Sequence, residues 1–214
     1  MGGGRPLLAG TGFASPYFVS TGTAMMRRDV PETMIRVVPL GNIDIDIVST
    51  VAEETGSLLG FPVTVAPTAS IEGFAKESPG RQYFAAHLLK CLRSLAKGPG
   101  LTVAITDVDL SYPGLNYVFG LADREYPAAI ISIARFGQGD ERKPAGRGVI
   151  GRAVKTAVHE VGHLLGLSHC SQRQCVMFFS YNLSDTDHKS KEFCKACRRV
   201  LTRNPQVLRE VSEL

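Results

Sequence analysis

His159-Glu-Val-Gly-His-Leu-Leu-Gly-Leu-Ser-His169 is the stretch around which this 214-residue chain is organised. On a helix, residues four apart share a face, so His159 and His163 can bind one zinc ion through their ring nitrogens. Glu160 follows the first ligand, where its carboxylate can take a proton from a zinc-bound water. Gly166 can adopt a positive φ and end the helix, which lets the chain return His169 as a third ligand. Three protein ligands leave the fourth position open, as is typical of a catalytic zinc site.

The full pattern is more specific than its first half. A bare H-E-x-x-H can occur by chance, and a single helix histidine is more often structural than a ligand. Here the eleven residues place three of the chain's five histidines, a glutamate and a glycine at fixed offsets. The stretch therefore predicts a zinc centre rather than ordinary helix histidines.

Four of the five cysteines follow this motif. Four residues separate Cys170 from Cys175, and two separate Cys194 from Cys197. Two such pairs fit a closed tetrahedral zinc site with four thiolates and a structural role. Two disulfides, or one redox pair with spare thiols, are the alternatives. Because Cys170 directly follows His169, a zinc ion bound here would fix the loop that presents the third histidine.

Strand and helix signals alternate along the chain, which predicts an α/β domain with a mixed sheet. Asn42 is the expected N-cap of the first helix, and Cys91 is expected to be a small buried residue of the second. The helix with the zinc motif is apolar on most sides, so it should be buried. The expected strands cover 34–40, 61–66, 101–106, 116–122 and 128–134, with a loop at 67–80 and a turn-rich connection at 107–114. The expected helices cover 44–59, 81–97, 149–165 and 192–202, followed by a short one that opens at Asn204-Pro205.

Composition divides the chain into three segments. Residues 1–33 are rich in Gly, Thr and Ser with weak periodicity, which favours a flexible extension over a signal peptide. Residues 34–166 carry the predicted strands and the helix with His159 and His163. Residues 167–214 are short, basic and rich in cysteine, as expected of a small separate subdomain.

The overall composition is that of an ordinary globular protein, with 44% hydrophobic and 21% charged residues. The formal net charge of +4 is mild, so we expect no nucleic-acid partner. No apolar stretch reaches the length of a membrane-spanning helix, and we expect no membrane partner. The absence of a signal peptide indicates the cytoplasm, where clustered cysteines bind metal more often than they form disulfides. We expect a monomer.

Together these motifs resemble the archaemetzincins, a small family of metzincin zinc proteases. The resemblance covers about residues 149–197, and other metzincins lack the four cysteines. The residues that carry it are His159-Glu-Val-Gly-His163, Gly166, His169-Cys170, Cys175-Val-Met177 and Cys194-Lys-Ala-Cys197.

The resemblance implies a metzincin-like fold with a twisted mixed sheet and the active-site helix in an upper subdomain, 34–166. A lower subdomain, 167–214, would hold the structural zinc. Met177 would lie beneath the zinc ligands as a hydrophobic support, and the strand near 116–122 would pair with an extended peptide substrate. Tyr181 is a candidate for stabilising the oxyanion, with packing beside Phe178 and Phe179 as the alternative.

The expected function is zinc-dependent hydrolysis of peptide bonds in a peptide or protein substrate. His159, His163 and His169 would bind the catalytic zinc, and Glu160 would act as general base and then as general acid. The chain would carry two Zn²⁺ ions, one catalytic and one structural. Two alternatives remain: an aminopeptidase acting on short peptides, and a non-catalytic zinc-stabilised binding protein with the same fold.

Overall fold

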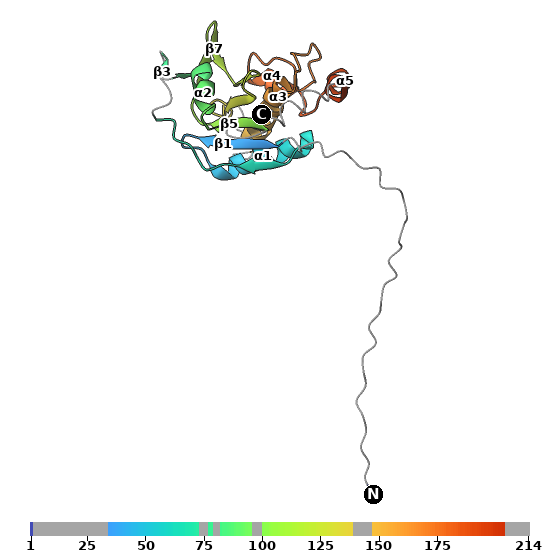
Figure 1. Ribbon diagram of the computed structural model, residues 1–214. Helices are drawn as coiled ribbons and strands as arrows, with labels where there is room; N and C mark the ends of the chain where they lie inside the picture. The colour runs from blue at the N-terminus through green and yellow to red at the C-terminus, as the bar shows by residue number, and fades with distance from the viewer. Residues whose placement is uncertain (2–33, 73–76, 79–81, 96–99, 139–146, 204–214) are drawn as a thin grey trace.

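The computed structural model describes Met1 and residues 34–72, 77–78, 82–95, 100–138 and 147–203 (Figure 1). The extension predicted for 1–33, apart from Met1, and the short helix predicted from Asn204 onward lie outside the described residues.

A five-stranded mixed sheet forms the centre of the molecule, in the order β2-β1-β5-β9-β8. Its first four strands are parallel to one another, and β8 closes one edge in the antiparallel direction. Every residue of β5 is buried, which is typical of a parallel strand covered on both faces. The predicted α/β class with a mixed sheet is therefore confirmed. The strands span Val63–Val65 (β2), Ile35–Leu40 (β1), Leu101–Thr106 (β5), Ala128–Ser132 (β9) and Gly120–Asp123 (β8).

Helices cover both faces of this sheet. Because side chains alternate along a strand, neighbouring residues enter different cores. Val37 and Val103 pack in a core with α1 and α3. Their neighbours Val38 and Ala104 pack with α2 on the other face. Figure 1 shows α1 along β1 on one side of the sheet and α2 on the opposite side. These helices span Ile45–Leu59 (α1), Ala85–Leu92 (α2) and Arg147–Leu164 (α3).

A second sheet, which the sequence did not predict, has the order β3-β4-β6-β7. It corrects three expectations. Short strands lie inside the predicted loop at 67–80 and the predicted connection at 107–114. The helix predicted from residue 81 begins only at Ala85, because Tyr83 and Phe84 before it pair with β6. The strands span Glu77–Ser78 (β3), Gln82–Phe84 (β4), Leu110–Tyr112 (β6) and Leu115–Val118 (β7).

The single strand predicted at 116–122 is two strands in two different sheets. β7 ends at Val118 and β8 begins at Gly120, with Phe119 between them. Phe119 is buried, and its ring lies 5.4 Å from that of Phe136. This anchor lies where the chain passes from one sheet to the other, and the backbone therefore changes its pairing partner there.

Two local predictions are wrong. The cap of α1 is Asp44, whose carboxylate accepts a hydrogen bond from the Asp46 N–H at 2.9 Å, and not Asn42. Cys91 is half-buried rather than buried, because α2 turns Leu88 and Leu92 into the core instead.

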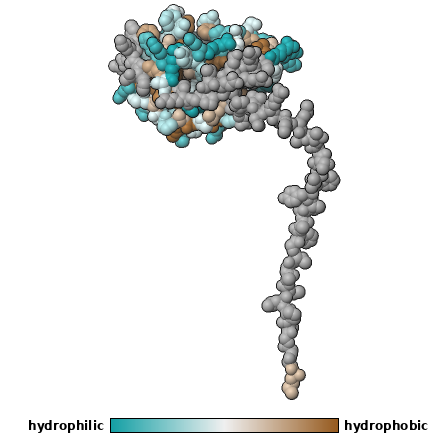
Figure 2. Space-filling view, in the orientation of Figure 1, coloured by the Kyte–Doolittle hydropathy of each residue, from teal (hydrophilic) through white to brown (hydrophobic). Residues whose placement is uncertain are grey.

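Between Gly166 and Arg203 the chain forms two short helices, α4 (Leu183–His188) and α5 (Lys195–Arg203). The sequence predicted a helix near α5 but missed α4, whose six residues are too short to show a helical period. Among the described residues, no helix has the length and apolar character needed to span a bilayer. On the face shown in Figure 2, hydrophilic and hydrophobic residues are mixed over the described part of the chain.

Candidate metal centres

The helix α3 presents the first two histidines and then ends as the sequence predicts. Gly166 has a φ of 93°, in the left-handed region, and the Leu167 N–H reaches back to the Gly162 carbonyl at 2.9 Å. The chain reverses at this point and brings His169 back to the helix. All three histidines named from the motif therefore meet in space.

The three histidines face one another through their Nε2 atoms. His163 Nε2 lies 3.1 Å from His159 Nε2 and 3.2 Å from His169 Nε2. Tetrahedral coordination with Zn–N bonds of about 2.0–2.1 Å places neighbouring nitrogens about 3.3 Å apart. The spacing therefore fits three nitrogen ligands of one zinc ion.

The other ring nitrogens of two histidines are held by backbone carbonyls. His159 Nδ1 lies 2.8 Å from the Val176 carbonyl oxygen, and His163 Nδ1 lies 2.8 Å from that of Leu167. Donation from Nδ1–H leaves the Nε2 lone pair free to face a metal. Burial is the main cause that lowers the pKa of all three imidazoles, which favours the neutral form that binds metal.

Met177 packs against the helix that carries the first two histidines. It is fully buried and lies against Gly162, which stands between His159 and His163 in the sequence. A Cβ atom at Gly162 would lie only 2.4 Å from Met177 Sδ. The glycine therefore lets the sulfur approach the helix backbone next to His163.

Glu160 is buried on the neighbouring side of α3 and faces the edge strand β8. A Cβ atom at Gly120 would lie 2.6 Å from Glu160 Oε1, so this glycine provides the space for the carboxyl group. Burial raises the pKa of Glu160 to about 8, although the charge of Lys189 opposes the shift. A carboxyl group with a raised pKa can exchange a proton near neutral pH.

Lys189 is a residue of this region that sequence reasoning missed. Its side chain is buried, its Nζ donates a hydrogen bond to the Phe178 carbonyl at 3.2 Å, and burial lowers its pKa to about 8. It follows α4 in a run of charged residues, which from the sequence would be expected at the surface. Nothing in the linear pattern distinguishes it from a surface lysine.

Tyr181 does not lie against the histidines. Its residue is 72% exposed, and its ring packs on Phe179 with 4.7 Å between ring centroids. Phe179 in turn contacts the ring of His169 at 4.9 Å. The geometry supports the packing alternative for Tyr181.

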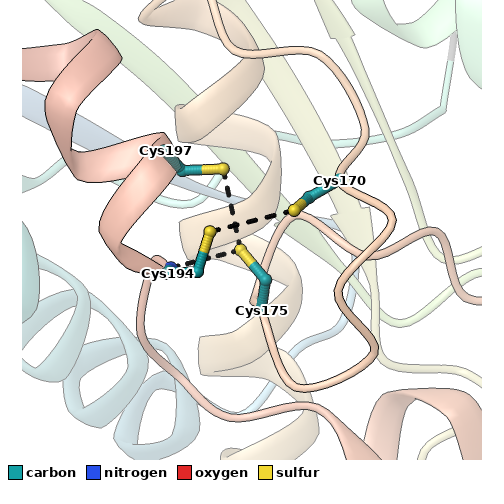
Figure 3. Close-up of side chains that lie close together, drawn as sticks. All are labelled: Cys170, Cys175, Cys194 and Cys197. Atoms are coloured by element: carbon teal, nitrogen blue, oxygen red, sulfur yellow. Dashed lines mark hydrogen bonds between the residues drawn. The ribbon is translucent and has the colours of Figure 1, made fainter.

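The four clustered cysteines converge on one point, as Figure 3 shows. Cys170 Sγ lies 3.9 Å from Cys194 Sγ, and Cys175 Sγ lies 3.8 Å from Cys197 Sγ. Zn–S bonds of about 2.3 Å in a tetrahedron place sulfurs about 3.8 Å apart, whereas a disulfide needs about 2.05 Å. The cysteines are free, so the geometry fits a four-thiolate metal site and not disulfides.

Backbone amides support the sulfurs as they do in thiolate sites. The Cys194 N–H donates to Cys175 Sγ at 3.3 Å, and the Gln172 N–H donates to Cys170 Sγ at 3.5 Å. Hydrogen bonds to backbone and thiol groups lower the pKa of Cys194 to about 7. The thiolate form that a metal requires is therefore favoured at that position.

One loop connects the two clusters. Cys170 follows His169, and its N–H donates to the Met177 carbonyl at 2.9 Å. Within the same loop, the Val176 carbonyl holds His159. A metal bound by the cysteines would therefore stabilise the segment that positions two of the three histidines.

Arg152 fastens α3 to the segment that carries Lys189. It is buried and forms a two-pronged ion pair with Asp187, with Nε–Oδ1 at 2.8 Å and Nη2–Oδ2 at 2.6 Å. It also donates to the carbonyl of Gln138 at 3.0 Å. The ligand helix, α4 and the chain after β9 are thereby held together.

The chain is similar to known proteins over most of its length. The profile of peptidase family M54 matches residues 68–203. An archaemetzincin from Pyrococcus furiosus is 38% identical over 180 residues, which cover 78% of this chain and 92% of that protein. The crystal structure of an archaemetzincin from Methanopyrus kandleri superposes with a TM-score of 0.70 at 35% identity and covers 82% of this chain and 97% of that one. A zinc-dependent peptidase from Methanocorpusculum labreanum has the same TM-score at 29% identity, covering 78% of this chain and 99% of that one.

Proposed function

Because this chain belongs to peptidase family M54, the family of the archaemetzincins, we propose that its two ligand clusters are the catalytic and the structural centre of a zinc-dependent peptidase. His159, His163 and His169 are the ligands of the catalytic zinc, and Glu160 is the general base. The observation that carries this assignment is the convergence of three Nε2 atoms beside one buried carboxyl group.

Zinc, when bound, polarises a peptide carbonyl and makes water more acidic. Glu160 takes a proton from the attacking water and delivers it to the leaving amine. Burial raises the pKa of this carboxyl group in the metal-free protein, so the group can hold a proton between the two steps. Donation from the Nδ1–H groups of His159 and His163 keeps both rings in one orientation and one tautomer throughout.

The substrate lies along β8 as an added strand. β8 pairs with β9 on one side only and is the edge of its sheet among the described strands. Its Gly120 lies against Glu160, so a peptide paired with this edge passes beside the general base. Backbone pairing gives affinity for an extended peptide without demanding a particular sequence.

Cys170, Cys175, Cys194 and Cys197 hold a structural zinc that stabilises the loop between the two centres. Free thiols in this cluster are stable in a reducing compartment, which supports a cytoplasmic location. We infer a monomeric enzyme with an upper subdomain of residues 34–166 and a lower subdomain of residues 167–214.

The substitution Glu160→Gln tests the assignment. The zinc-loaded protein is incubated with a mixture of unstructured peptides, and the products are identified by mass spectrometry. We expect turnover to fall by about 10²- to 10⁴-fold, because general acid–base catalysis is lost while the metal ligands remain. Two zinc ions per chain should be retained.

Glu53→Gln is the matched control, because Glu53 lies on the exposed face of α1 and belongs to neither ligand cluster. It should leave turnover and zinc content unchanged. Normal turnover in Glu160→Gln would remove this residue from the mechanism. Peptides with acetylated N-termini separate the two classes of peptidase, since an aminopeptidase would not cleave them.

A further inference from the structure

A small cavity lies directly beside Glu160. Its volume is about 60 Å³, and it is bounded by residues 117–120 of the β7–β8 region, by α3 at His159, and by the segment from Phe179 to Lys189. Because about 10–15 Å³ measured in this way suffices for one water molecule, the cavity has room for several. It is large enough for a short polar group.

Two polar groups in the wall of this cavity can form more hydrogen bonds than they make with the described residues. Lys189 is 3% exposed, and its ammonium group, which can donate three hydrogen bonds, makes one, to the Phe178 carbonyl. The Ser180 hydroxyl is also buried and has no partner among the described residues. Buried donors without partners are costly, so their presence together indicates that a ligand supplies the acceptor.

The charges around Lys189 leave its ammonium group available to bind an anion. Glu160 and Asp185 attract its ammonium group and Lys155 repels it, but no carboxylate of the described residues lies within ion-pair distance of Nζ. A buried cation without a contacting anion is unfavourable. A carboxylate that enters the cavity would accept hydrogen bonds from Lys189 and Ser180 at once.

We propose that this cavity binds an acidic side chain of the substrate, with Lys189 and Ser180 as the groups that recognise its carboxylate. The inference rests on the proposed function and adds a substrate class to it. The side chain belongs to the residue that follows the cleaved bond. That residue supplies the leaving amine, to which Glu160 returns the proton, and Glu160 forms part of the cavity wall.

The chemistry of the cavity wall selects a carboxylate. A carboxylate offers only acceptors, which match the two donor groups of Lys189 and Ser180, whereas an amide would bring an N–H₂ group toward a cation.

Four succinyl hydroxamates test the inference by isothermal titration calorimetry on the zinc-loaded protein. The hydroxamate binds the metal in each case, and the side chain at the position after the cleaved bond is carboxymethyl, carbamoylmethyl or isobutyl. The fourth compound has no side chain and ends in a free carboxylate. We expect the carboxymethyl compound to bind about 10- to 100-fold more tightly than the carbamoylmethyl compound, because charged hydrogen bonds contribute about that much.

In Lys189→Met, the ratio of the affinities for the carboxymethyl and carbamoylmethyl compounds should fall to about one. The affinity for the isobutyl compound should stay within about threefold of the wild-type value, a difference of less than ~1 kcal/mol. Ser180→Ala should reduce the preference by about 2- to 10-fold, as expected for the loss of one neutral hydrogen bond. Lys191→Met is the matched control, because Lys191 is two residues away, partly exposed and paired with Glu54 outside the cavity. It should leave the preference unchanged.

The outcomes distinguish this inference from the proposed function. If no hydroxamate binds, the open zinc site itself is refuted. If the isobutyl compound binds as well as the carboxymethyl compound, or the preference survives in Lys189→Met, the acidic subsite is refuted and the zinc site stands. If the compound with the free terminal carboxylate binds as tightly as the carboxymethyl compound and depends on Lys189, the cavity recognises a chain terminus instead of a side chain.

Discussion

Gly162→Ala tests whether the contact between Met177 and the ligand helix is as close as the structure shows. Alanine normally stabilises a helix interior relative to glycine by about 1 kcal/mol. At Gly162 the new Cβ would lie 2.4 Å from Met177 Sδ and 3.1 Å from Phe193 Cε1. Real Cβ contacts are essentially never shorter than 3.0 Å, so the sulfur must move.

The expected cost follows from the burial of Met177. Because this side chain is fully buried, moving it displaces close-packed neighbours. Overpacking a close-packed core costs about 1–3 kcal/mol. Subtracting the gain of about 1 kcal/mol in helix propensity leaves a net loss of about 0–2 kcal/mol.

Gly151→Ala is the matched control, because Gly151 lies in the same helix and a Cβ there would meet nothing within 4 Å. This variant should be more stable than the wild type by about 1 kcal/mol, the full difference in helix propensity between alanine and glycine. The two variants should therefore differ by about 1–3 kcal/mol, which is about 2–12 °C in Tm for a chain of this size. Thermal unfolding is followed by circular dichroism at equal, saturating zinc.

The double variant Gly162→Ala/Met177→Ala separates the clash from other effects. With the sulfur removed, Gly162→Ala should stabilise as Gly151→Ala does, and the two sites should show a coupling energy of about 1–3 kcal/mol. The reasoning is refuted if Gly162→Ala raises the Tm as much as Gly151→Ala does when Met177 is intact.

Three further predictions concern zinc content and stability. Cys175→Ser should lower the zinc content from two ions to one and reduce the Tm. Cys91→Ser is the control, because Cys91 lies outside the cluster, and it should change neither quantity. An unchanged Tm with two zinc ions in Cys175→Ser would refute the structural site. Burial raises the pKa of Glu160 from its model-peptide 4.5 to about 8 in the metal-free protein, so the folded state binds the extra proton between these values and wild-type stability falls as pH rises through them. Glu160→Gln should remove this loss of stability, which amounts to a few kcal/mol at ~1.4 kcal/mol per pKa unit. The free energy of unfolding is measured in urea at pH 5 and pH 8.5. An equal decrease between these two pH values in both proteins would contradict the prediction. Asp187→Ala should cost about 1.5–3 kcal/mol in the same assay because it removes two charged hydrogen bonds from the buried side chain of Arg152, and a loss below 1 kcal/mol would contradict that.

Much of the fold could be predicted because its signals are local. The apolar runs at 101–106 and 128–134 are the buried strands β5 and β9, and a single glycine at each C-terminus ends α1 and α3. These signals depend on residues only a few positions apart. The errors fall where the partner is distant, as at 116–122, where one apolar run divides between two sheets around Phe119.

The same distinction holds for the candidate site. Spacing on one helix and one return loop was enough to name the histidines and the four cysteines that the structure brings together. It could not reveal Lys189, because a lysine in a charged run is buried only when α4 folds back over α3.

The sequence by itself thus determined the α/β class and the two ligand clusters, since helical periodicity and short-range spacing are written in consecutive residues. Only the tertiary structure decided what surrounds the carboxyl group of Glu160. Gly120 approaches it from β8, and Ser180 and Lys189 line the same cavity from the segment after Met177. The burial that raises its pKa exists only when these segments pack against α3.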